Sequence, residues 1–150
     1  MNIKRVSNMD AIARSRLVTI SVDRPLLEAA RHLSDTQISL VVVCDADGVM
    51  AGVITKTDLV KKIGHCLGSA CQTLAAELMV SDVASCSPAD LISDVLTLME
   101  KRGFVHFPVV DANRKPLGVV NARDALRVLV ADGEYQESQL RDYVMGVGYH

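Results

Sequence analysis

Apolar and polar residues follow one another along the chain in a pattern that predicts two similar series of strands and helices. Continuous β-branched runs, typical of buried strands, are followed by apolar residues spaced three and four apart, which is the spacing of one helix face. In the first series we expect a strand at 18–22, a helix beginning at Pro25, strands at 40–44 and 49–54, and a helix from Thr55. In the second we expect a strand at 83–86, a helix at 90–101, a hairpin at 105–120 and a helix at 122–130.

The second series is a copy of the first. The segment Gly52-Val53-Ile54-Thr55-Lys56-Thr57-Asp58 returns as Gly118-Val119-Val120-Asn121-Ala122-Arg123-Asp124, at a spacing of 118 − 52 = 66 residues. Upstream the match continues at the same spacing, with Val43 and Asp45 matched by Val109 and Asp111. A register kept through several elements, on apolar and polar residues alike, indicates an internal duplication.

The duplication predicts the domain organisation. We expect the first repeat, with its N-terminal lead-in and a partly helical connector, at 1–78, the second at 79–133, and a C-terminal tail at 134–150 that contains a short helix. The chain has 150 residues, 49% of them hydrophobic, and half of such a chain would leave much of its apolar surface exposed to water. We therefore expect an α/β fold in which two pseudo-symmetric β-α-β-β-α repeats pack as one module.

Charge and composition exclude several classes of function. The 16 basic residues are balanced by 18 acidic ones, and the chain has no Trp, so neither a basic field nor stacking platforms for nucleic acid are expected. The first 16 residues lack the apolar stretch of a secretory signal, and no apolar run approaches membrane-spanning length. The sequence therefore predicts a cytoplasmic protein with neither a nucleic acid nor a membrane as partner.

The cysteines and histidines do not form a recognisable chemical site. The four cysteines, Cys44, Cys66, Cys71 and Cys86, include no CxxC pair, which is typical of a reduced protein. Cys66 and Cys71, with the adjacent His65, match no common zinc spacing, so a metal site or enzyme built on them is the weakest hypothesis. Nucleophile elbow, Walker and HExxH motifs are absent, so we expect no catalytic residue and no enzyme activity.

The duplicated segment carries the candidate binding chemistry. A strand that ends at Ile54 and passes through Thr55 into a helix directs the N–H groups of the first helical turn outward, where they bind anions. The Thr55 hydroxyl can donate to a phosphate, and the Asp58 carboxylate can accept from both hydroxyls of a ribose. Thr-x-x-Asp is also close to a capping box, in which the two side chains only close the helix end. The tetrapeptide leaves both interpretations open.

The second repeat departs from this pattern at one position. Asn121 stands where the first repeat has Thr55, and Asn is a good helix cap but a different phosphate partner. Asp124 is retained for a ribose, and Arg123 and His106 could supply positive charge to a phosphate. We expect one competent site, in the first repeat, and one weaker or altered site.

These residues carry a resemblance to a known family. Gly52 to Asp58 resembles the nucleotide-binding signature of CBS domains, which is a glycine, two apolar residues, Ser or Thr, two variable residues and Asp. The sequence Pro-Val-Val-Asp at 108–111 also resembles the CBS family. In the first repeat, Val42 stands at the position of that proline. The chain resembles, over about residues 14–131, a tandem CBS pair, or Bateman module. Such pairs are α/β domains with two clefts between the repeats, and many bind adenosine ligands there.

The resemblance implies a regulatory module that senses AMP, ADP, ATP or a related adenosyl compound, needs no cofactor, and signals to an unidentified partner protein. The alternative is a structural or dimerisation module without a physiological ligand. Adenine recognition is expected to use backbone groups around 38–40. The candidate ligand-binding residues are Thr19, Ile38, Ser39, Leu40, Gly52, Val53, Ile54, Thr55 and Asp58 in the first repeat, and His106, Pro108, Gly118, Asn121, Arg123 and Asp124 in the second.

We also expect a homodimer. Tandem CBS pairs commonly associate through their helices, and the apolar content of the helices predicted here exceeds what one small core requires. The residues concerned are Leu59, Val60, Ile63, Leu126, Val128 and Leu129.

Overall fold

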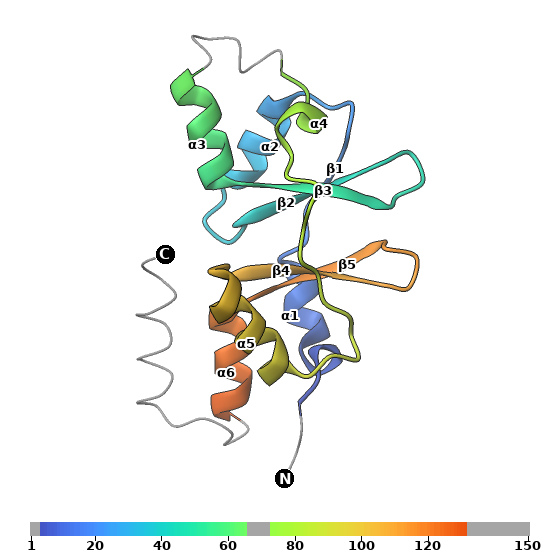
Figure 1. The fold of residues 1–150 in the computed structure, drawn as a ribbon, viewed down its shortest axis with the longest axis vertical. Coiled ribbons are helices and arrows are strands. Elements are labelled where there is room, and N and C mark those ends of the chain that lie inside the picture. Colours follow the sequence, from blue (N-terminus) through green and yellow to red (C-terminus); the bar gives the residue numbers. More distant parts are fainter. Residues whose placement is uncertain (1–3, 66–72, 132–150) are drawn as a thin grey trace. The chain divides into compact units, whose positions relative to one another are not determined.

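The computed structural model describes residues 4–65 and 73–131, except for the side chains of residues 64 and 65. The chain divides into two compact units (Figure 1). One, here called the first-repeat unit, comprises Arg16–Ala84 and Asp111–Pro116. The other, here called the second-repeat unit, comprises Met1–Ser15, Ser85–Val110 and Leu117–His150. Each unit is an α/β structure built on one of the two predicted repeats.

The first-repeat unit is a three-stranded sheet with helices on one face (Figure 1). Its elements are β1 (Thr19–Ser21), α2 (Leu26–Leu33), β2 (Leu40–Cys44), β3 (Met50–Thr55), α3 (Lys56–His65) and α4 (Ala75–Leu78). The sheet order is β1-β2-β3, in which β2 runs parallel to β1 and antiparallel to β3. The strands and helices predicted for this repeat are confirmed, with their ends shifted by a residue or two.

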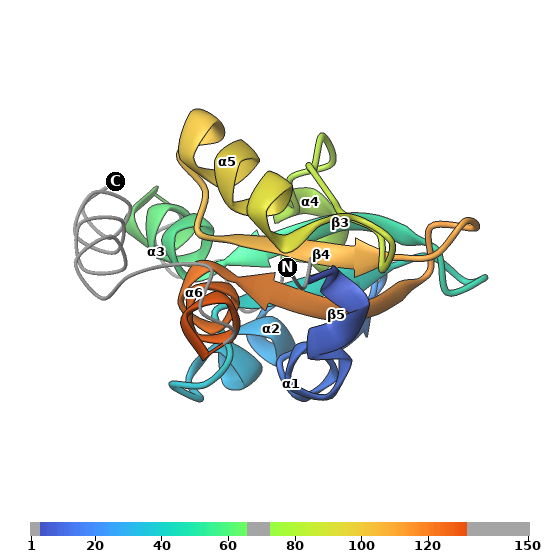
Figure 2. The ribbon, with the colours of Figure 1, turned by 90° about the horizontal axis from the view of Figure 1, so that it is seen from below.

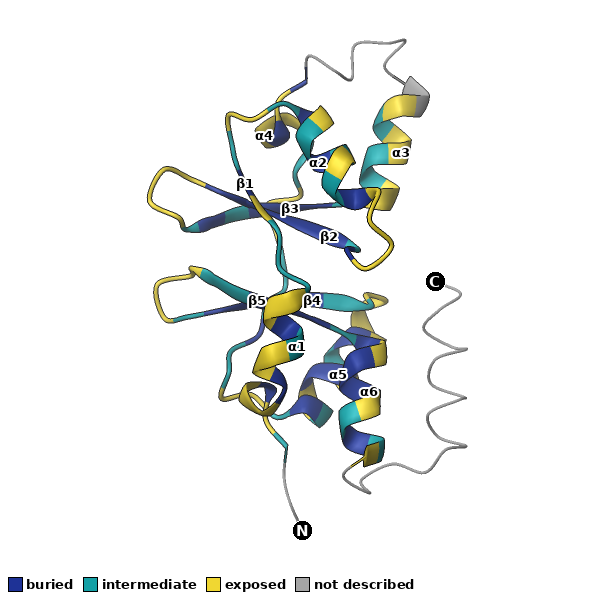
Figure 3. Ribbon diagram, turned by 180° about the vertical axis from the view of Figure 1, so that it is seen from behind, coloured by how far each residue is buried: buried dark blue, intermediate teal, exposed yellow. Residues whose placement is uncertain are grey.

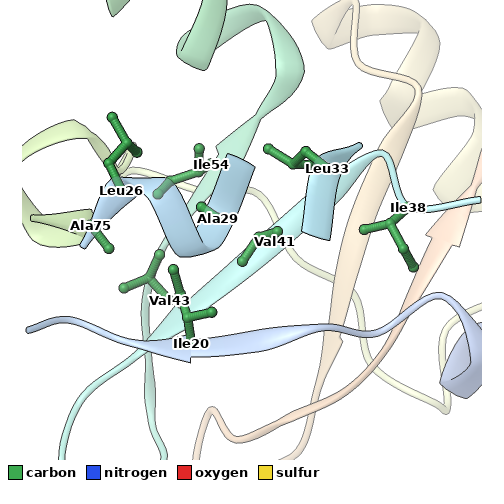
Figure 4. Packing of buried hydrophobic residues seen from close by; sticks show 9 residues of the cluster. All are labelled: Ile20, Leu26, Ala29, Leu33, Ile38, Val41, Val43, Ile54 and Ala75. Carbon is green, nitrogen blue, oxygen red and sulfur yellow. The ribbon is translucent and has the colours of Figure 1, made fainter. Parts of the chain in front are cut away.

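A compact apolar cluster holds the sheet and the helices of this unit together. Figure 4 shows its nine residues, which come from every layer of the unit: Ile20, Leu26, Ala29, Leu33, Ile38, Val41, Val43, Ile54 and Ala75. All five residues of β2 are buried, including those that point away from this cluster. Burial on both faces explains why the strand is a continuous apolar run rather than an alternating one.

The second-repeat unit is built on a strand pair with helices beside it. Its elements are the 3-10 helix η1 (Val6–Met9), α1 (Asp10–Ser15), α5 (Ile92–Arg102), β4 (His106–Val110), β5 (Pro116–Asn121) and α6 (Ala122–Ala131). Strands β4 and β5 form a two-stranded sheet, and the helix α5 ends at Gly103, whose φ of 72° is left-handed. The predicted helices and hairpin of this repeat are confirmed.

The strand predicted at 83–86 is wrong. Only Cys86 pairs, in an isolated parallel bridge to Val109, with Cys86 N donating to Pro108 O at 3.0 Å and Val110 N to Cys86 O at 2.9 Å. Its neighbours Ser85 and Ser87 are polar, and Pro88 lacks the N–H that a ladder needs. This segment therefore makes one bridge where β1, its counterpart in the first repeat, makes a short strand.

The helices η1 and α1 were not predicted for the N-terminal residues. Val6, Met9 and Ala13 are 2–3% exposed and are spaced three and four residues apart. This spacing is a helical signal, although it is short and is carried by only three apolar side chains. The N-terminal lead-in is therefore a packed part of the protein.

The segment that leads into the second repeat belongs to the first-repeat unit. Residues 73–76 pair with residues 22–26 through three backbone hydrogen bonds: Leu26 N to Thr73 O (2.7 Å), Ala75 N to Arg24 O (2.8 Å) and Ala76 N to Val22 O (3.1 Å). The helix α4 follows this pairing and buries Ala75 in the apolar cluster.

The segment that leads into the first repeat makes the same pairing in the second-repeat unit. Residues 4–7 pair with residues 88–92: Ile92 N to Lys4 O (3.0 Å), Val6 N to Asp90 O (2.9 Å) and Ser7 N to Pro88 O (2.9 Å). These three bonds correspond one by one to those of the first-repeat unit. Each unit thus combines the body of one repeat with the lead-in segment of the other.

The matched residues Asp45 and Asp111 close equivalent turns. Asp45 Oδ1 accepts hydrogen bonds from the backbone N–H groups of Asp47 and Val49, at 2.9 and 3.0 Å. Asp111 Oδ1 accepts from those of Asn113 and Lys115, at 2.8 and 3.0 Å. These aspartates have a local structural role, because each fixes the turn between two strands.

Candidate functional site

The first candidate site lies where β3 ends and α3 begins. Thr55 is the last residue of β3 and Lys56 the first of α3, so the chain passes directly from the sheet into the helix. Leu40, at the start of β2, pairs with Thr55 across the sheet. This register places Leu40 beside the β3–α3 junction, and Ile38 and Ser39 directly precede it in the chain.

Thr55 and Asp58 form a complete capping box. Asp58 Oδ2 accepts hydrogen bonds from the backbone N–H of Thr55 (3.0 Å) and from its hydroxyl (2.9 Å). The backbone N–H of Asp58 donates in return to Thr55 Oγ1 at 3.3 Å. Both side chains are half-buried, and Asp58 Oδ1 accepts no hydrogen bond from any residue that the structure describes. The carboxylate is therefore fixed through one oxygen and available through the other.

Gly52 is required by the packing of the lead-in segment against β3. A Cβ atom there would lie 2.7 Å from Val80 O and 2.9 Å from Met79 Cγ and Sδ. The close approach is held by two backbone hydrogen bonds, Val53 N to Val80 O (3.0 Å) and Val80 N to Val53 O (2.9 Å). The glycine at position 52 thus has a steric explanation that involves no ligand.

The remaining candidates of the first repeat are mostly apolar, and Thr19 lies away from this junction, on the far side of β2. Ile38 and Ile54 belong to the apolar cluster, and the side chains of Leu40 and Val53 are buried too. Ser39 is half-buried, and Thr19 is exposed at the start of β1, where it pairs with Val42. Their side chains therefore offer few polar groups to a ligand.

The equivalent junction in the second repeat, between β5 and α6, has a different polar arrangement. Asn121 Oδ1 accepts from the backbone N–H of Asp124 at 2.8 Å, so the asparagine caps α6. Asp124 is only 2% exposed, whereas Asp58 is half-buried. The Asp124 carboxylate is therefore less accessible than that of Asp58.

The other candidates of the second repeat lie on α6, β4 and β5, and only some of them are close to this junction. Ala122 N donates to Val105 O at 2.7 Å, so half-buried His106, at the start of β4, lies near Asn121. Arg123 is exposed in the first turn of α6, and Pro108 is buried in β4. Gly118 again meets a lead-in segment: a Cβ there would lie 2.8 Å from Ala13 C, and Figure 2 shows α1 beside β5.

Lys56 is a polar residue of the first junction that our sequence-based candidates omit. It is exposed at the first position of α3, next to Thr55, and makes no ion pair with a residue that the structure describes. A comparison of the two repeats could have found it, because the second repeat has Ala122 at this position and its basic residue, Arg123, one position later.

The described cysteines are buried thiols. Desolvation raises the pKa of the Cys86 thiol to about 12, with a smaller contribution from Asp90, and desolvation also raises the pKa of Cys44. Neither is in a disulfide. Cys66 and Cys71 and the side chain of His65 lie outside the described residues, as does the helix predicted in the tail. Elsewhere, no group of three His, Cys, Asp or Glu side chains is placed to hold a metal ion.

The six apolar helix residues that motivated a dimer differ in exposure, and two of them, Leu59 and Val128, are half-buried. Leu126 and Leu129 are completely buried, so they belong to the core of the second-repeat unit. On α3, by contrast, Val60 is 67% and Ile63 58% exposed, and Figure 3 shows yellow exposed positions along that helix. Over the parts of the chain with a described fold, no helix is long and apolar enough to cross a membrane.

Comparison with protein families matches the CBS domain model twice, at residues 9–65 and 75–131. Among curated proteins, an uncharacterised 17.7 kDa protein of Acidianus ambivalens is 25% identical over 142 residues, covering 95% of this chain and 85% of the relative. Arabinose 5-phosphate isomerase GutQ of Salmonella typhimurium is 33% identical over 115 residues, which are 77% of this chain but only 34% of the isomerase.

Solved structures of CBS domain pairs have the same fold. The CBS-domain protein ATU1752 of Agrobacterium tumefaciens has a TM-score of 0.73 at 29% identity, covering 83% of this chain and 98% of that one. The CBS pair of protein MJ0100, solved with 5'-methylthioadenosine and S-adenosyl-L-methionine, has a TM-score of 0.74 at 24% identity over 87% and 99% of the two chains. CBSX2 in complex with AMP has a TM-score of 0.71 at 18% identity over 86% and 98%.

Proposed function

Because this chain belongs to the CBS domain family and carries two CBS domains in tandem, we propose that it is a regulatory module that binds an adenosine-containing ligand and has no catalytic activity. The candidates are AMP, ADP, ATP and related adenosyl compounds. Two structural neighbours support this class of ligand, since MJ0100 was solved with methylthioadenosine and S-adenosylmethionine, and CBSX2 with AMP. We place the principal site at the β3–α3 junction of the first repeat.

The observation that carries the proposal is the state of the Asp58 carboxylate. One of its oxygens is held by the backbone and hydroxyl of Thr55, while Oδ1 has no partner among the described residues and the side chain is half-buried. A carboxylate oriented in this way can accept hydrogen bonds from ribose hydroxyls without first losing side-chain freedom.

The other groups of the junction have complementary roles in this proposal. The outward N–H groups of the first turn of α3 bind the phosphate, and the backbone of Ile38 to Leu40 binds the adenine edge. In the second repeat, Asn121 and the buried Asp124 make a weaker site. The Thr55 hydroxyl already donates to Asp58, so it must rotate to donate to a phosphate.

The proposed output is a change in a partner protein, and we further propose that the module is a cytoplasmic homodimer. A segment similar to this chain makes up about a third of the larger protein GutQ. The exposed apolar side chains Val60 and Ile63 on α3 offer a surface for a second copy. Light scattering at tens of micromolar protein tests the dimer, which a monomeric mass would contradict.

The test of the ligand site compares the two aspartates by calorimetric titration with AMP. Asp58→Ala should weaken binding about ten- to a hundred-fold, because a charge-assisted hydrogen bond contributes roughly 1.5 to 3 kcal/mol. Asp124→Ala is the matched variant and should weaken binding less. Both substitutions alter a helix start, so the melting temperatures of the unliganded variants are measured first. Unchanged AMP affinity in a folded Asp58→Ala protein would contradict the site.

The second candidate function is a structural module in which Thr55 and Asp58 only cap α3. It is favoured by the three hydrogen bonds of the capping box, which are complete without a ligand. Thermal unfolding distinguishes the two functions, because a ligand that binds only the native state must raise the melting temperature. A melting temperature unaffected by millimolar AMP, ATP, methylthioadenosine and S-adenosylmethionine would support the structural function.

A further inference from the structure

The two helices that follow the duplicated motif differ from the other described helices in their first turn. The first three residues are Asp-Ala-Ile in α1, Leu-Leu-Glu in α2, Ala-Ala-Glu in α4 and Ile-Ser-Asp in α5, each with an acidic residue and no basic one. In α3 they are Lys-Thr-Asp and in α6 Ala-Arg-Asp. A basic residue is therefore present in the first turn only where the candidate sites lie, among the helices that the structure describes.

A lysine at this position does not help the helix. The N-terminal end of a helix carries partial positive charge, so an acidic side chain stabilises it and a basic one destabilises it. Lys56 occupies the first position of α3 and is exposed. A neutral residue at this exposed position would stabilise the helix better than lysine does. A residue that is unfavourable for its own helix is typical of a functional site.

Neighbouring acidic groups do not neutralise Lys56. The Asp58 carboxylate is turned back onto Thr55, which donates both of the hydrogen bonds that this carboxylate accepts from the described residues. Lys56 makes no ion pair within the described part of the chain, so its ammonium group is available to a ligand.

We propose that Lys56 determines the ligand class of the first site, favouring adenosine ligands that carry a phosphate over neutral or cationic adenosyl compounds. The inference rests on the proposed function, since it concerns the same site. Asp58 recognises the ribose, which AMP, methylthioadenosine and S-adenosylmethionine all contain. Lys56 recognises the group attached to the ribose, because an ammonium attracts a phosphate dianion and repels a sulfonium cation.

The experiment measures the affinities of AMP and adenosine, which differ only by the phosphate, for three proteins: the unsubstituted chain, Lys56→Met and Lys61→Met. Lys61 is the matched control, because it is an exposed lysine of the same helix, five residues further along. Five residues correspond to about 7.5 Å along the axis, close to the screening length of about 8 Å at physiological ionic strength. Melting temperatures confirm that both variants are folded.

Lys56→Met should weaken AMP binding by up to about five-fold, the upper end of the range expected for an exposed ion pair, and should leave adenosine binding unchanged. Lys61→Met should change neither affinity. Added salt should reduce the preference for AMP over adenosine in the unsubstituted chain and have less effect in Lys56→Met.

Two results would overturn the inference while leaving the proposed function intact. One is an unchanged ratio of AMP to adenosine affinity in Lys56→Met, and the other is an equal loss of AMP affinity in Lys56→Met and Lys61→Met. If the unsubstituted chain binds neither AMP nor adenosine, the role of Lys56 is refuted, and the proposed function is wrong too if ATP, methylthioadenosine and S-adenosylmethionine also fail to bind.

Discussion

Substitution of Gly52 by Ala tests whether this glycine serves the lead-in segment. The added Cβ would lie 2.7 Å from Val80 O and 2.9 Å from Met79 Cγ and Sδ, where ordinary contacts begin at 3.4 Å. The Met79 side chain can move aside, but Val80 O belongs to the backbone and is hydrogen-bonded to Val53 N. The segment must therefore retreat from β3 by 3.4 − 2.7 = 0.7 Å.

The cost follows from the contacts that this retreat strains. The two hydrogen bonds between Val53 and Val80 each contribute about 0.5–1.5 kcal/mol, and overpacking of a tight site costs about 1–3 kcal/mol. Replacing glycine also reduces the entropy of the unfolded chain, which offsets about 0.4–1 kcal/mol. We expect Gly52→Ala to lower the free energy of unfolding by about 1–2 kcal/mol.

Urea unfolding measures this loss, and hydrogen exchange shows where it arises. The amide hydrogens of Val53 and Val80 should exchange faster in Gly52→Ala. Gly103→Ala is the control, because its added Cβ has no atom within 4 Å and its strain comes from a φ of 72°. That variant should lose stability without faster exchange at Val53 or Val80.

A second substitution, Met79→Ala, tests the same contact. It removes two of the three atoms nearest to the added Cβ. The stability lost in the double variant Gly52→Ala/Met79→Ala should therefore be smaller than the sum of the losses in the two single variants. If Gly52→Ala unfolds at the same urea concentration as the unsubstituted chain and Val80 is equally protected, the steric explanation of this glycine is wrong.

Three further predictions concern other parts of the fold. Deletion of residues 1–15 removes buried Val6, Met9 and Ala13, so it should destabilise the second-repeat unit by about 3–6 kcal/mol, measured by loss of amide protection in α5 and α6 first. Burial raises the pKa of the Cys86 thiol to about 12, whereas the thiol of the unfolded chain loses its proton near pH 9. The free energy of unfolding should therefore fall as pH rises from about 9 to 12, and urea unfolding should show a weaker pH dependence in Cys86→Ala. Leu126→Ala, at a completely buried position, should cost about 2–5 kcal/mol in thermal or urea unfolding, whereas Val60→Ala, at a position 67% exposed, should cost less than about 0.5 kcal/mol if the protein is monomeric in the assay.

Sequence patterns determined the elements whose stabilising contacts are local or repetitive. The run Leu40 to Cys44 specifies a strand buried on both faces, and the structure has β2 with those bounds. Thr55 and Asp58 are three residues apart, and the hydrogen bonds between them are those expected of that spacing. The duplication also predicted the family, because it displays the same motif in two equivalent places.

Patterns in the helices were less decisive about burial. Val60 and Ile63 have the same apolar character as Leu126 and Leu129, yet the first two are exposed and the last two are buried. Periodicity gives the apolar face of a helix, but it does not say which part of that face another element covers. The same limit applies to the carboxylates of the two repeats, since equivalent positions in the motif leave Asp58 half-buried and Asp124 buried.

The lead-in segments were decided by tertiary structure alone. Residues 4–7 pair with 88–92, and residues 73–76 with 22–26, so each repeat is completed by a segment that belongs to the other in sequence. Backbone hydrogen bonds of this kind are almost independent of side-chain identity and leave no periodic signal. The later parts of the lead-ins do leave a trace in the sequence, because Gly52 and Gly118 lie where the backbone of Val80 and of Ala13 approaches too closely for a side chain. The sequence by itself therefore determined the repeats, their elements and the motif, whereas only the fold decided which segments complete each repeat, because that depends on contacts between residues far apart in the chain.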